Sequence, residues 1–475
     1  MRELSVVEAV REALEIEMAR DERVLVFGED VGQLGGVFRA TEGLLDRFGP
    51  ERVVDMPMAE LTIVGFAVGL AMRGMRPVAE IQFADFIHAA ADHLIGEAAK
   101  VRYRTGGDWT CPLVVRTPYG AGFRGGPYHS QSIEAFYAHV PGLKVVAPST
   151  PADAKGLLIA AIRDPDPVLV LEHKRTYRAI KGHVPEGDYT VPIGKANVAR
   201  GGTDATILAY GMMFHESMAA AETLALQGIS IEVVDLRTLL PLDRETILTS
   251  LRKTRRLCVV HEDTLTMGLG AELVAIAAEA DVLDVPPVRV TMPDVSGIPV
   301  DDVLEDAILP NRHTIANAVA SLVDRRSGVS LGATFDPAIP QAASVVEIVM
   351  DDDHIAAAID ALVSACRAFP RFNATFTWDG IAEHDVVRVD LDLGPHAPAG
   401  AHGTITLVDF GTASSHMAIP FVRPGQTAAI RIGAVRDGRA FVACAVDHRA
   451  VDGGEVGRFL AHFKAEIEEK RLVRR

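Results

Sequence analysis

The first three hundred residues alternate short β-branched runs with segments of helical period, and this alternation limits the fold more than any other feature. Each run ends at a Gly, Pro or Ser break and is followed by an Ala-rich segment. The strand candidates of the first block are RVLVFGED, RPVAEIQF, PLVVRTP, LKVVAPS and PVLVLEH. Strands that alternate with helices in this way form parallel sheets covered by helices. The sequence therefore predicts an α/β fold.

A second block of the same kind begins near residue 190, after the turn-rich stretch IKGHVPEGDYTVP, and closes near Asp324. Its strand candidates are ATILAYG, ISIEVVDLR and RLCVVHED. We therefore expect two tandem parallel-sheet domains, residues 1–190 and 191–325. Residues 326–342 are rich in Gly, Ser, Ala and Pro, which is typical of a linker between domains.

The remaining residues, 343–475, have a different pattern. The stretch MDDDHIAAAIDALVSACRAF predicts an Asp-capped helix, and two strands flank the hairpin signal Asp437-Gly438. The last helix, EVGRFLAHFKAEIEE, carries one apolar stripe. This pattern predicts an α+β domain.

Composition excludes several classes of protein. The net charge of −17 disfavours nucleic acid as a partner. No stretch reaches the roughly 18–20 consecutive apolar residues of a membrane span, and the opening MRELSVVEAV lacks the apolar core of a secretory signal. A cytoplasmic location without a membrane partner is expected. The four widely spaced cysteines are expected in the core, since they form no CxxC pair.

Three residues of the first block stand out as candidates for chemistry. Glu60 lies in DMPMAELTIVG between a turn and an apolar helix, Phe86 ends EIQFADF, and His129 lies in the Gly-rich loop GGPYHSQS. Singly, each has an ordinary explanation: a carboxylate near a helix dipole, a core aromatic and a loop histidine. The combination of the three residues is a more specific indication of a functional site than any one of them alone.

Nearly all of residues 1–325 resembles the β subunit of the thiamine-dependent 2-oxo acid dehydrogenases. The runs that carry the resemblance are VVDMPMAE, EIQFADF, YHSQS, EAFYAHVPGLKVVAPSTPADAKGLL and DLRTLLPLD. EIQFADF and KVRYR are closer to the branched-chain type than to the pyruvate type, although bacterial members of both types share them. The resemblance implies a transketolase-like pyrimidine-binding domain, followed by a C-terminal domain whose usual role is subunit contact.

The resemblance also assigns roles around thiamine diphosphate. Glu60 matches the carboxylate that hydrogen-bonds the pyrimidine ring nitrogen and promotes the imino tautomer, a proton-transfer role. Phe86 matches the aromatic residue on the pyrimidine face. His129 matches the histidine that orients substrate or lipoyl groups and moves protons during acyl transfer. Glu29, in the acidic end of RVLVFGED, is counted among the cofactor contacts.

Two metal ions follow from the same resemblance. A set of residues matches a structural potassium site in which much of the ligation would come from backbone carbonyls: Leu113, Val114, Ala161, Asp164 and Asp166. The cofactor diphosphate needs Mg²⁺ held by oxygen ligands, and the usual motif begins Gly-Asp-Gly. No GDG occurs in this chain. The Mg²⁺ ligands are therefore expected from a partner α subunit, and the chain alone is expected to bind thiamine diphosphate poorly.

The stretch DHRAVDGG, 447–454, belongs to a second resemblance, to the catalytic core of the dihydrolipoyl acyltransferases. In that family the histidine, here His448, deprotonates the thiol of coenzyme A or dihydrolipoamide, and the aspartate, here Asp452, orders the loop. Three departures count against catalysis. The segment between LDLGP and HGTITLV is nearly gone, Val408 stands where the family carries a hydroxyl residue, and no lipoyl domain lies upstream.

Three functions remain open at this stage. The leading one is a β component that decarboxylates pyruvate or a branched 2-oxo acid with an α subunit and passes the acyl group to a lipoyl-bearing protein. Its C-terminal domain would then serve for trimerisation, so that self-association runs through both the β-subunit domains and this domain. The alternatives are a bifunctional chain with an active acyltransferase and a non-catalytic scaffold. A transketolase that acts alone is disfavoured without the Mg²⁺ motif. The 2-oxo acid and the final acyl acceptor stay open.

Overall fold

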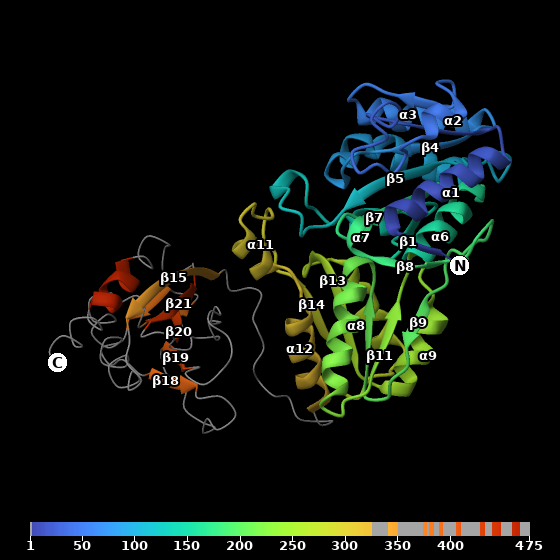
Figure 1. Cartoon of the computed structure of the whole chain (residues 1–475). Coiled ribbons are helices and arrows are strands. Elements are labelled where there is room, and N and C mark those ends of the chain that lie inside the picture. Colours follow the sequence, from blue (N-terminus) through green and yellow to red (C-terminus); the bar gives the residue numbers. More distant parts are fainter. Residues whose placement is uncertain are drawn as a thin grey trace. The chain divides into compact units, whose positions relative to one another are not determined.

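The computed structural model describes residues 2–324 and, beyond them, 341–349, 374–377, 380–383, 389–392, 405–409, 428–432, 439–447 and 458–465. The chain divides into two compact units, Met1–Ser330 and Leu331–Arg475 (Figure 1). In the described ranges no helix combines the length and the apolar character that a membrane crossing requires.

The first domain of the larger unit is built on a seven-stranded sheet in the order β12-β6-β7-β5-β4-β2-β3. Its strands are β2 (Val24–Gly28), β3 (Val53–Asp55), β4 (Arg76–Glu80), β5 (Val114–Tyr119), β6 (Lys144–Val146), β7 (Val168–His173) and β12 (Thr238–Leu240). Every neighbouring pair is parallel except β12 with β6. The five strands expected from the first block are all present in this sheet.

The helices of this domain cover both faces of the sheet. They are α1 (Val6–Arg20), α2 (Leu44–Phe48), α3 (Glu60–Met72), α4 (Val101–Arg104), α5 (Glu134–Ala138), α6 (Pro151–Arg163), α7 (Thr176–Ala179) and the short helices η1 (Ala84–Ala90), η2 (Asp92–Glu97), η3 (Ala98–Lys100) and η4 (Gly126–Tyr128). A two-stranded ribbon, β1 (Arg2–Ser5) with β8 (Lys181–Val184), adjoins α1. Helix α1 begins at the Ser5 capping box that the sequence predicts, with Glu8 as its second member.

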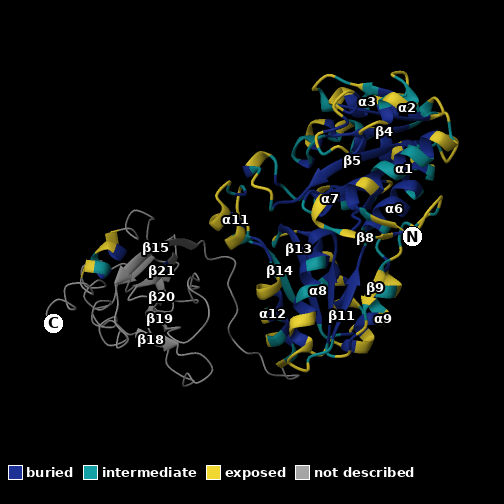
Figure 2. Ribbon diagram, in the orientation of Figure 1, coloured by how far each residue is buried: buried dark blue, intermediate teal, exposed yellow. Residues whose placement is uncertain are grey.

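Side chains of one strand alternate between two cores. In β2, Val24 and Val26 pack with α1 and α6, whereas Leu25 and Phe27 pack with α3 on the opposite face. Because both faces are covered, the strand is apolar along its whole length, as Figure 2 shows for the central strands. The continuous apolar runs in the sequence have this physical origin.

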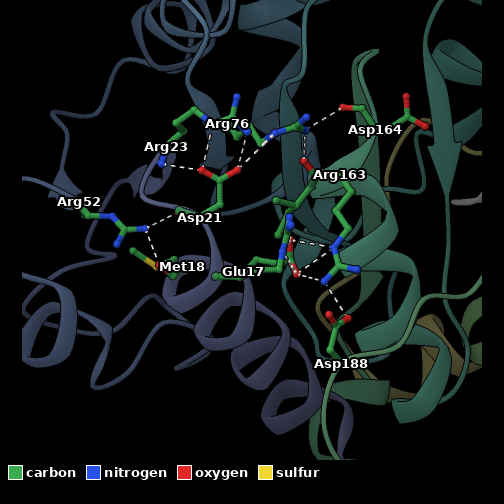
Figure 3. A network of polar contacts seen from close by, with 11 residues as sticks. Glu17, Met18, Asp21, Arg23, Arg52, Arg76, Arg163, Asp164 and Asp188 are labelled. Carbon is green, nitrogen blue, oxygen red and sulfur yellow. Dashed lines mark hydrogen bonds and ion pairs between the residues drawn. The ribbon is translucent and has the colours of Figure 1, made fainter.

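A polar network ties α1 to α6 near the ends of the strands (Figure 3). The Glu17 carboxylate is fully buried and accepts hydrogen bonds from Arg20 and Arg163. Arg163 also pairs with Asp188, and Arg76 donates to the main-chain carbonyl of Ile162 at 2.6 Å. These contacts hold α1 and α6 in place relative to each other on one face of the sheet.

The second domain has a five-stranded sheet in the order β14-β13-β10-β11-β9. Its strands are β9 (Asn197–Arg200), β10 (Ala205–Ala209), β11 (Ile231–Asp235), β13 (Leu257–Thr264) and β14 (Val288–Met292). Its helices are α8 (Gly211–Ala225), α9 (Arg244–Thr254), α10 (Leu269–Glu279), α11 (Asp302–Ile308) and α12 (Arg312–Asp324). Only β9 runs antiparallel to its neighbour.

One segment crosses between the sheets. Strand β12 follows β11 in sequence, within DLRTLLPLD, yet it pairs antiparallel with β6 at the edge of the first sheet. The Ala147 N–H donates to the Arg237 carbonyl at 2.8 Å and extends this pairing. An unpaired strand edge offers free N–H and carbonyl groups, and β12 satisfies them here.

The smaller unit contains a mixed sheet in the order β15-β21-β20-β19-β18. Its strands are β15 (Gln341–Val349), β18 (Val389–Asp392), β19 (Ile405–Asp409), β20 (Ala428–Ile432) and β21 (Arg439–Asp447), beside a hairpin of β16 (Ala374–Thr377) and β17 (Gly380–Glu383). Strands β20 and β21 are antiparallel, while β18, β19 and β20 are parallel. The expected helix around MDDDHIAAAIDALVSACRAF and the hairpin turn at Asp437-Gly438 lie outside the described residues.

Helix 458–465 buries Phe459, Leu460 and Phe463, three members of the apolar stripe expected for the last helix. The prediction of an α/β chain with two parallel-sheet domains and a further domain of mixed structure is confirmed. Three of the four cysteines are buried, Cys111, Cys258 and Cys444, and the fourth lies outside the described residues.

Candidate active site

Two carboxylates meet at the carboxyl end of β2. Glu29 follows this strand directly, and Glu60 is the first residue of α3, where the partial positive charge of a helix start favours an anion. Burial raises the pKa of Glu29, and the charge of Glu60 adds to this shift. The Oε1 atom of Glu29 is buried without a hydrogen-bond partner among the described residues. An unsatisfied acceptor beside a second carboxylate suits a ligand that brings N–H donors.

Apolar side chains are exposed beside Glu60. Met58, Leu61 and Phe66 have 83%, 47% and 50% of their surface exposed. Phe66 also packs edge-on against Phe27 of the core, at 5.7 Å between ring centroids. Several large exposed apolar side chains in one short segment are typical of a surface that a partner or ligand covers.

The structure brings Phe86 and His129 together. Their ring centroids are 5.4 Å apart with perpendicular planes, and Phe83 contacts the same imidazole at 4.6 Å. Phe83 in turn stacks with Phe123 at 6.1 Å. His129 is therefore held at the edges of two aromatic rings, next to the short helix η1 that carries Phe86.

The acidic pair and the aromatic group lie on neighbouring strand ends. Strand β4, which leads to Phe83 and Phe86, is parallel to β2, which leads to Glu29. The Gln82 side chain spans the two loops, since its amide donates to Asp30 at 3.2 Å. Ligands of α/β proteins usually bind at the carboxyl ends of such strands. The candidate site has this position.

The loop that carries His129 needs its glycines. Gly120 and Gly126 adopt positive φ angles of 87° and 67°, which favour glycine. A Cβ atom on Gly125 would lie 2.7 Å from the Cβ atom of His129. The Gly120 N–H donates to the Gln131 carbonyl at 3.0 Å and closes the base of the loop. Because Gly125 in the run GAGFRGG has no side chain, His129 can lie close to its backbone.

Three residues of this region were not singled out from the sequence. Glu262 accepts a hydrogen bond from the Ala121 N–H, and Glu305 accepts one from the Gly122 N–H, both at 2.9 Å. Lys174 is buried with its ammonium over the Phe123 ring. No motif marks them, because the contacts join residues more than fifty positions apart.

The expected potassium residues lie where β5 begins and α6 ends: Leu113, Val114, Ala161, Asp164 and Asp166. Both carboxylate oxygens of Asp164 accept hydrogen bonds from Lys144 at 2.7 Å, and Asp166 pairs with Arg102. The main-chain carbonyl of Asp164 accepts a hydrogen bond from Arg76. These carboxylates already have cationic partners, so they do not fit a potassium ion through their side chains.

Across the described part of the chain, no three His, Cys, Asp or Glu side chains gather into a metal-binding group. His448 and Asp452 lie outside the described residues. Val408 lies in β19, opposite Arg431 of β20.

Comparison with known families gives three matches along the chain. Residues 2–180 match the pyrimidine-binding domain of transketolase, and residues 194–315 match the transketolase C-terminal domain. Residues 393–473 match the catalytic domain of the 2-oxoacid dehydrogenase acyltransferases.

Individual relatives cover the first two of these domains. The 2-oxoisovalerate dehydrogenase subunit beta of Bacillus subtilis strain 168 is 51% identical over 326 residues, which is 68% of this chain and 100% of that protein. The pyruvate dehydrogenase E1 component subunit beta of the same organism is 51% identical over 296 residues, 62% of this chain and 91% of that protein. A solved split-gene transketolase, an inactive beta4 tetramer, has a TM-score of 0.56 and 25% identity, and the match covers 67% of this chain and 98% of that one.

Proposed function

This chain belongs to the family of 2-oxo acid dehydrogenase β subunits, and from that premise we propose that it decarboxylates a 2-oxo acid with thiamine diphosphate and a partner α subunit. The single observation that carries the proposal is that Glu60, Phe86 and His129 lie on neighbouring strand ends of a domain that matches the pyrimidine-binding family over residues 2–180.

The residues present fit the pyrimidine half of the cofactor. Glu60 would accept a hydrogen bond from a protonated ring nitrogen, and Phe86 offers an apolar face for the ring. The Oε1 atom of Glu29, which accepts no hydrogen bond from the described residues, would take a further N–H donor. Thiamine diphosphate supplies the nucleophilic carbon and the electron sink of the reaction. Glu60 would hold the proton of the ring nitrogen, while His129 would orient the substrate or lipoyl group and move protons there.

The other half of the cofactor site is proposed to come from the α subunit. The chain has no GDG sequence that could begin the usual Mg²⁺ motif. Met58, Leu61 and Phe66, which lie near Glu60 in the sequence, have exposed side chains that would be covered by that subunit. The chain by itself is therefore expected to bind thiamine diphosphate weakly.

Reconstitution tests this function. The chain is mixed with an α subunit of the branched-chain or the pyruvate type, thiamine diphosphate and Mg²⁺, and CO₂ release is measured from 2-oxoisovalerate and from pyruvate. We expect release that requires both chains, with the preferred acid naming the substrate class. A stable two-chain complex that releases no CO₂ from either acid would contradict the proposal and favour a scaffold.

For residues 343–475 we propose assembly rather than acyl transfer. The family match in this region begins at residue 393, the segment before HGTITLV is short, and Val408 supplies no hydroxyl group. A β subunit fused to a trimer-forming domain would stay at high local concentration near a lipoyl-bearing protein. Such a protein would receive the acyl group.

The assembly role predicts that His448→Ala has no effect on acyl transfer. Transfer from isobutyryl-coenzyme A to dihydrolipoamide is measured for the full chain and for the variant, and the mass of each assembly is determined. Equal background rates together with a mass that is a multiple of three chains are expected. A rate that is present in the full chain and lost in His448→Ala would instead establish an active acyltransferase.

A further inference from the structure

The loop that carries His129 is attached to the second domain at its first residues. Ala121 donates its N–H to Glu262 of β13, and Gly122 donates its N–H to Glu305 of α11, each at 2.9 Å. The two carboxylates are 3% and 2% exposed. Hydrogen bonds to a charged acceptor in a site without solvent are among the stronger ones in proteins.

Further contacts bring the loop against residues 292–309. Ala121 packs in a small apolar cluster with Met292, Ile298 and Leu309. A Cβ atom added to Gly126 would lie 2.8 Å from Val300, so that this part of the loop also approaches the second domain closely. Figure 1 shows the loop after β5 reaching toward α11. The position of the loop therefore depends on the second domain.

The other end of the loop is attached to the first domain. The Gln131 N–H donates to the Asp85 carboxylate at 3.1 Å, and Asp85 precedes Phe86 in η1. Phe83 and Phe86 contact the His129 ring edge-on. Carboxylates thus hold the loop on both sides of His129, and the imidazole lies against aromatic rings between them.

One buried ammonium lies within electrostatic range of all three carboxylates. Lys174 is 5% exposed, and the negative charges of Asp85, Glu262 and Glu305 act on it. Burial lowers the pKa of this ammonium to about 8, and the three carboxylates oppose that shift. At neutral pH a protonated Lys174 offsets part of the negative charge of the three carboxylates.

Glu262 has a second partner, since its carboxylate lies 2.9 Å from Nε2 of His173, a contact that Glu305 does not share. Burial by itself would raise the pKa of the Glu262 carboxyl, but the charge of His173 and hydrogen bonds from His173 and Ala121 lower it to about 2. Replacing Glu262 would therefore also disturb His173. Glu305 accepts from Gly122 and is the more selective position for a test.

We propose that Glu305 is a positioning residue for His129, so that helix α11 of the second domain sets the place of the imidazole in the active site of the first. The role of His129 in this inference rests on the proposed function. The hydrogen bond between Glu305 and the loop does not depend on that function. The second domain would then contribute to acyl transfer in addition to subunit contact. A shift of about 1 Å in a group of this kind can lower a rate by about 10²-fold.

The test compares Glu305→Ala and Glu305→Gln in the full chain, with Asp306→Ala as the control. Asp306 is exposed on the same helix, and its replacement changes the net charge by the same amount. Hydrogen–deuterium exchange is followed in peptides that cover residues 120–131. Loss of the acceptor in Glu305→Ala is expected to speed exchange of this loop about tenfold. Glu305→Gln retains an oxygen acceptor and is expected to restore most of the protection.

The second measurement uses the enzyme reconstituted with its α subunit. Acylation of a lipoyl domain is expected to fall about 10²-fold in Glu305→Ala and to recover largely in Glu305→Gln. Exchange in Glu305→Ala that matches the Asp306→Ala control would overturn the inference, and so would faster exchange with unchanged acylation. If the unmodified enzyme shows no turnover, the proposed function fails, and the exchange measurement still decides whether Glu305 holds the loop.

Discussion

Replacing Glu60 by glutamine is expected to lower decarboxylation by the reconstituted enzyme about 10³-fold, because glutamine cannot hold the proton that a carboxylate shares with the ring nitrogen. Glutamine has nearly the same shape, so the start of α3 and its contacts are retained. Glu60 contributes to the raised pKa of Glu29, which shows that the charges of the two carboxylates interact. Because Glu60 would take part in proton transfer, the loss is expected in turnover at saturating cofactor, and not only in cofactor affinity.

CO₂ release at saturating thiamine diphosphate measures this effect. Glu51→Gln is the matched control, since Glu51 is an exposed carboxylate just before β3 and its loss changes the net charge equally. The role assigned to Glu60 is refuted if Glu60→Gln and Glu51→Gln release CO₂ at the same rate.

The second large effect is expected at Arg116, a fully buried side chain in β5. Its guanidinium donates to both oxygens of Glu172 at 2.8 and 2.6 Å and to Glu80 at 2.6 Å, and the Tyr177 hydroxyl donates to Glu172 as well. Burial raises the pKa of Glu80, and Arg116 opposes that shift. One cation and two carboxylates thus form a single buried group inside the sheet.

Arg116→Met is expected to lower the free energy of unfolding by about 3–5 kcal/mol, since two buried carboxylates lose their cation. Urea unfolding of the full chain measures the loss, and Arg73→Met, at an exposed position after α3, is the control. Adding Glu80→Gln and Glu172→Gln to the variant is expected to recover part of the stability. This account would be contradicted if the first unfolding transition of Arg116→Met occurred at the same urea concentration as that of Arg73→Met.

The sequence predicted eight of the twelve strands in the sheets of the first two domains, because burial on both faces leaves continuous apolar runs such as VLVF in β2. The capping box at Ser5 and Glu8 was also predicted from the sequence, since it depends only on two residues that are three positions apart. Strand β12 was not predicted as part of the first sheet. It has three residues, and its pairing depends on the free edge of β6, which no local pattern records.

Part of the candidate site could also be predicted from short runs of sequence. Glu60, Phe86 and His129 lie in runs that resemble a known family, and the structure places Phe86 against His129. Glu305 and Lys174 act through contacts with a backbone N–H and with aromatic rings, which leave no signature in the sequence. Their part in the site follows only from the folded arrangement of the two domains.

The pairing of β12 with β6 also has a consequence for protein engineering. A substitution of the second domain by that of a relative would exchange an edge strand of the first sheet together with it. Chimeras joined near residue 190 would therefore need a donor whose edge strand matches β6 in register. A graft that keeps Thr238–Leu240 from the original chain and exchanges only the residues around it is the safer route to a folded chimera.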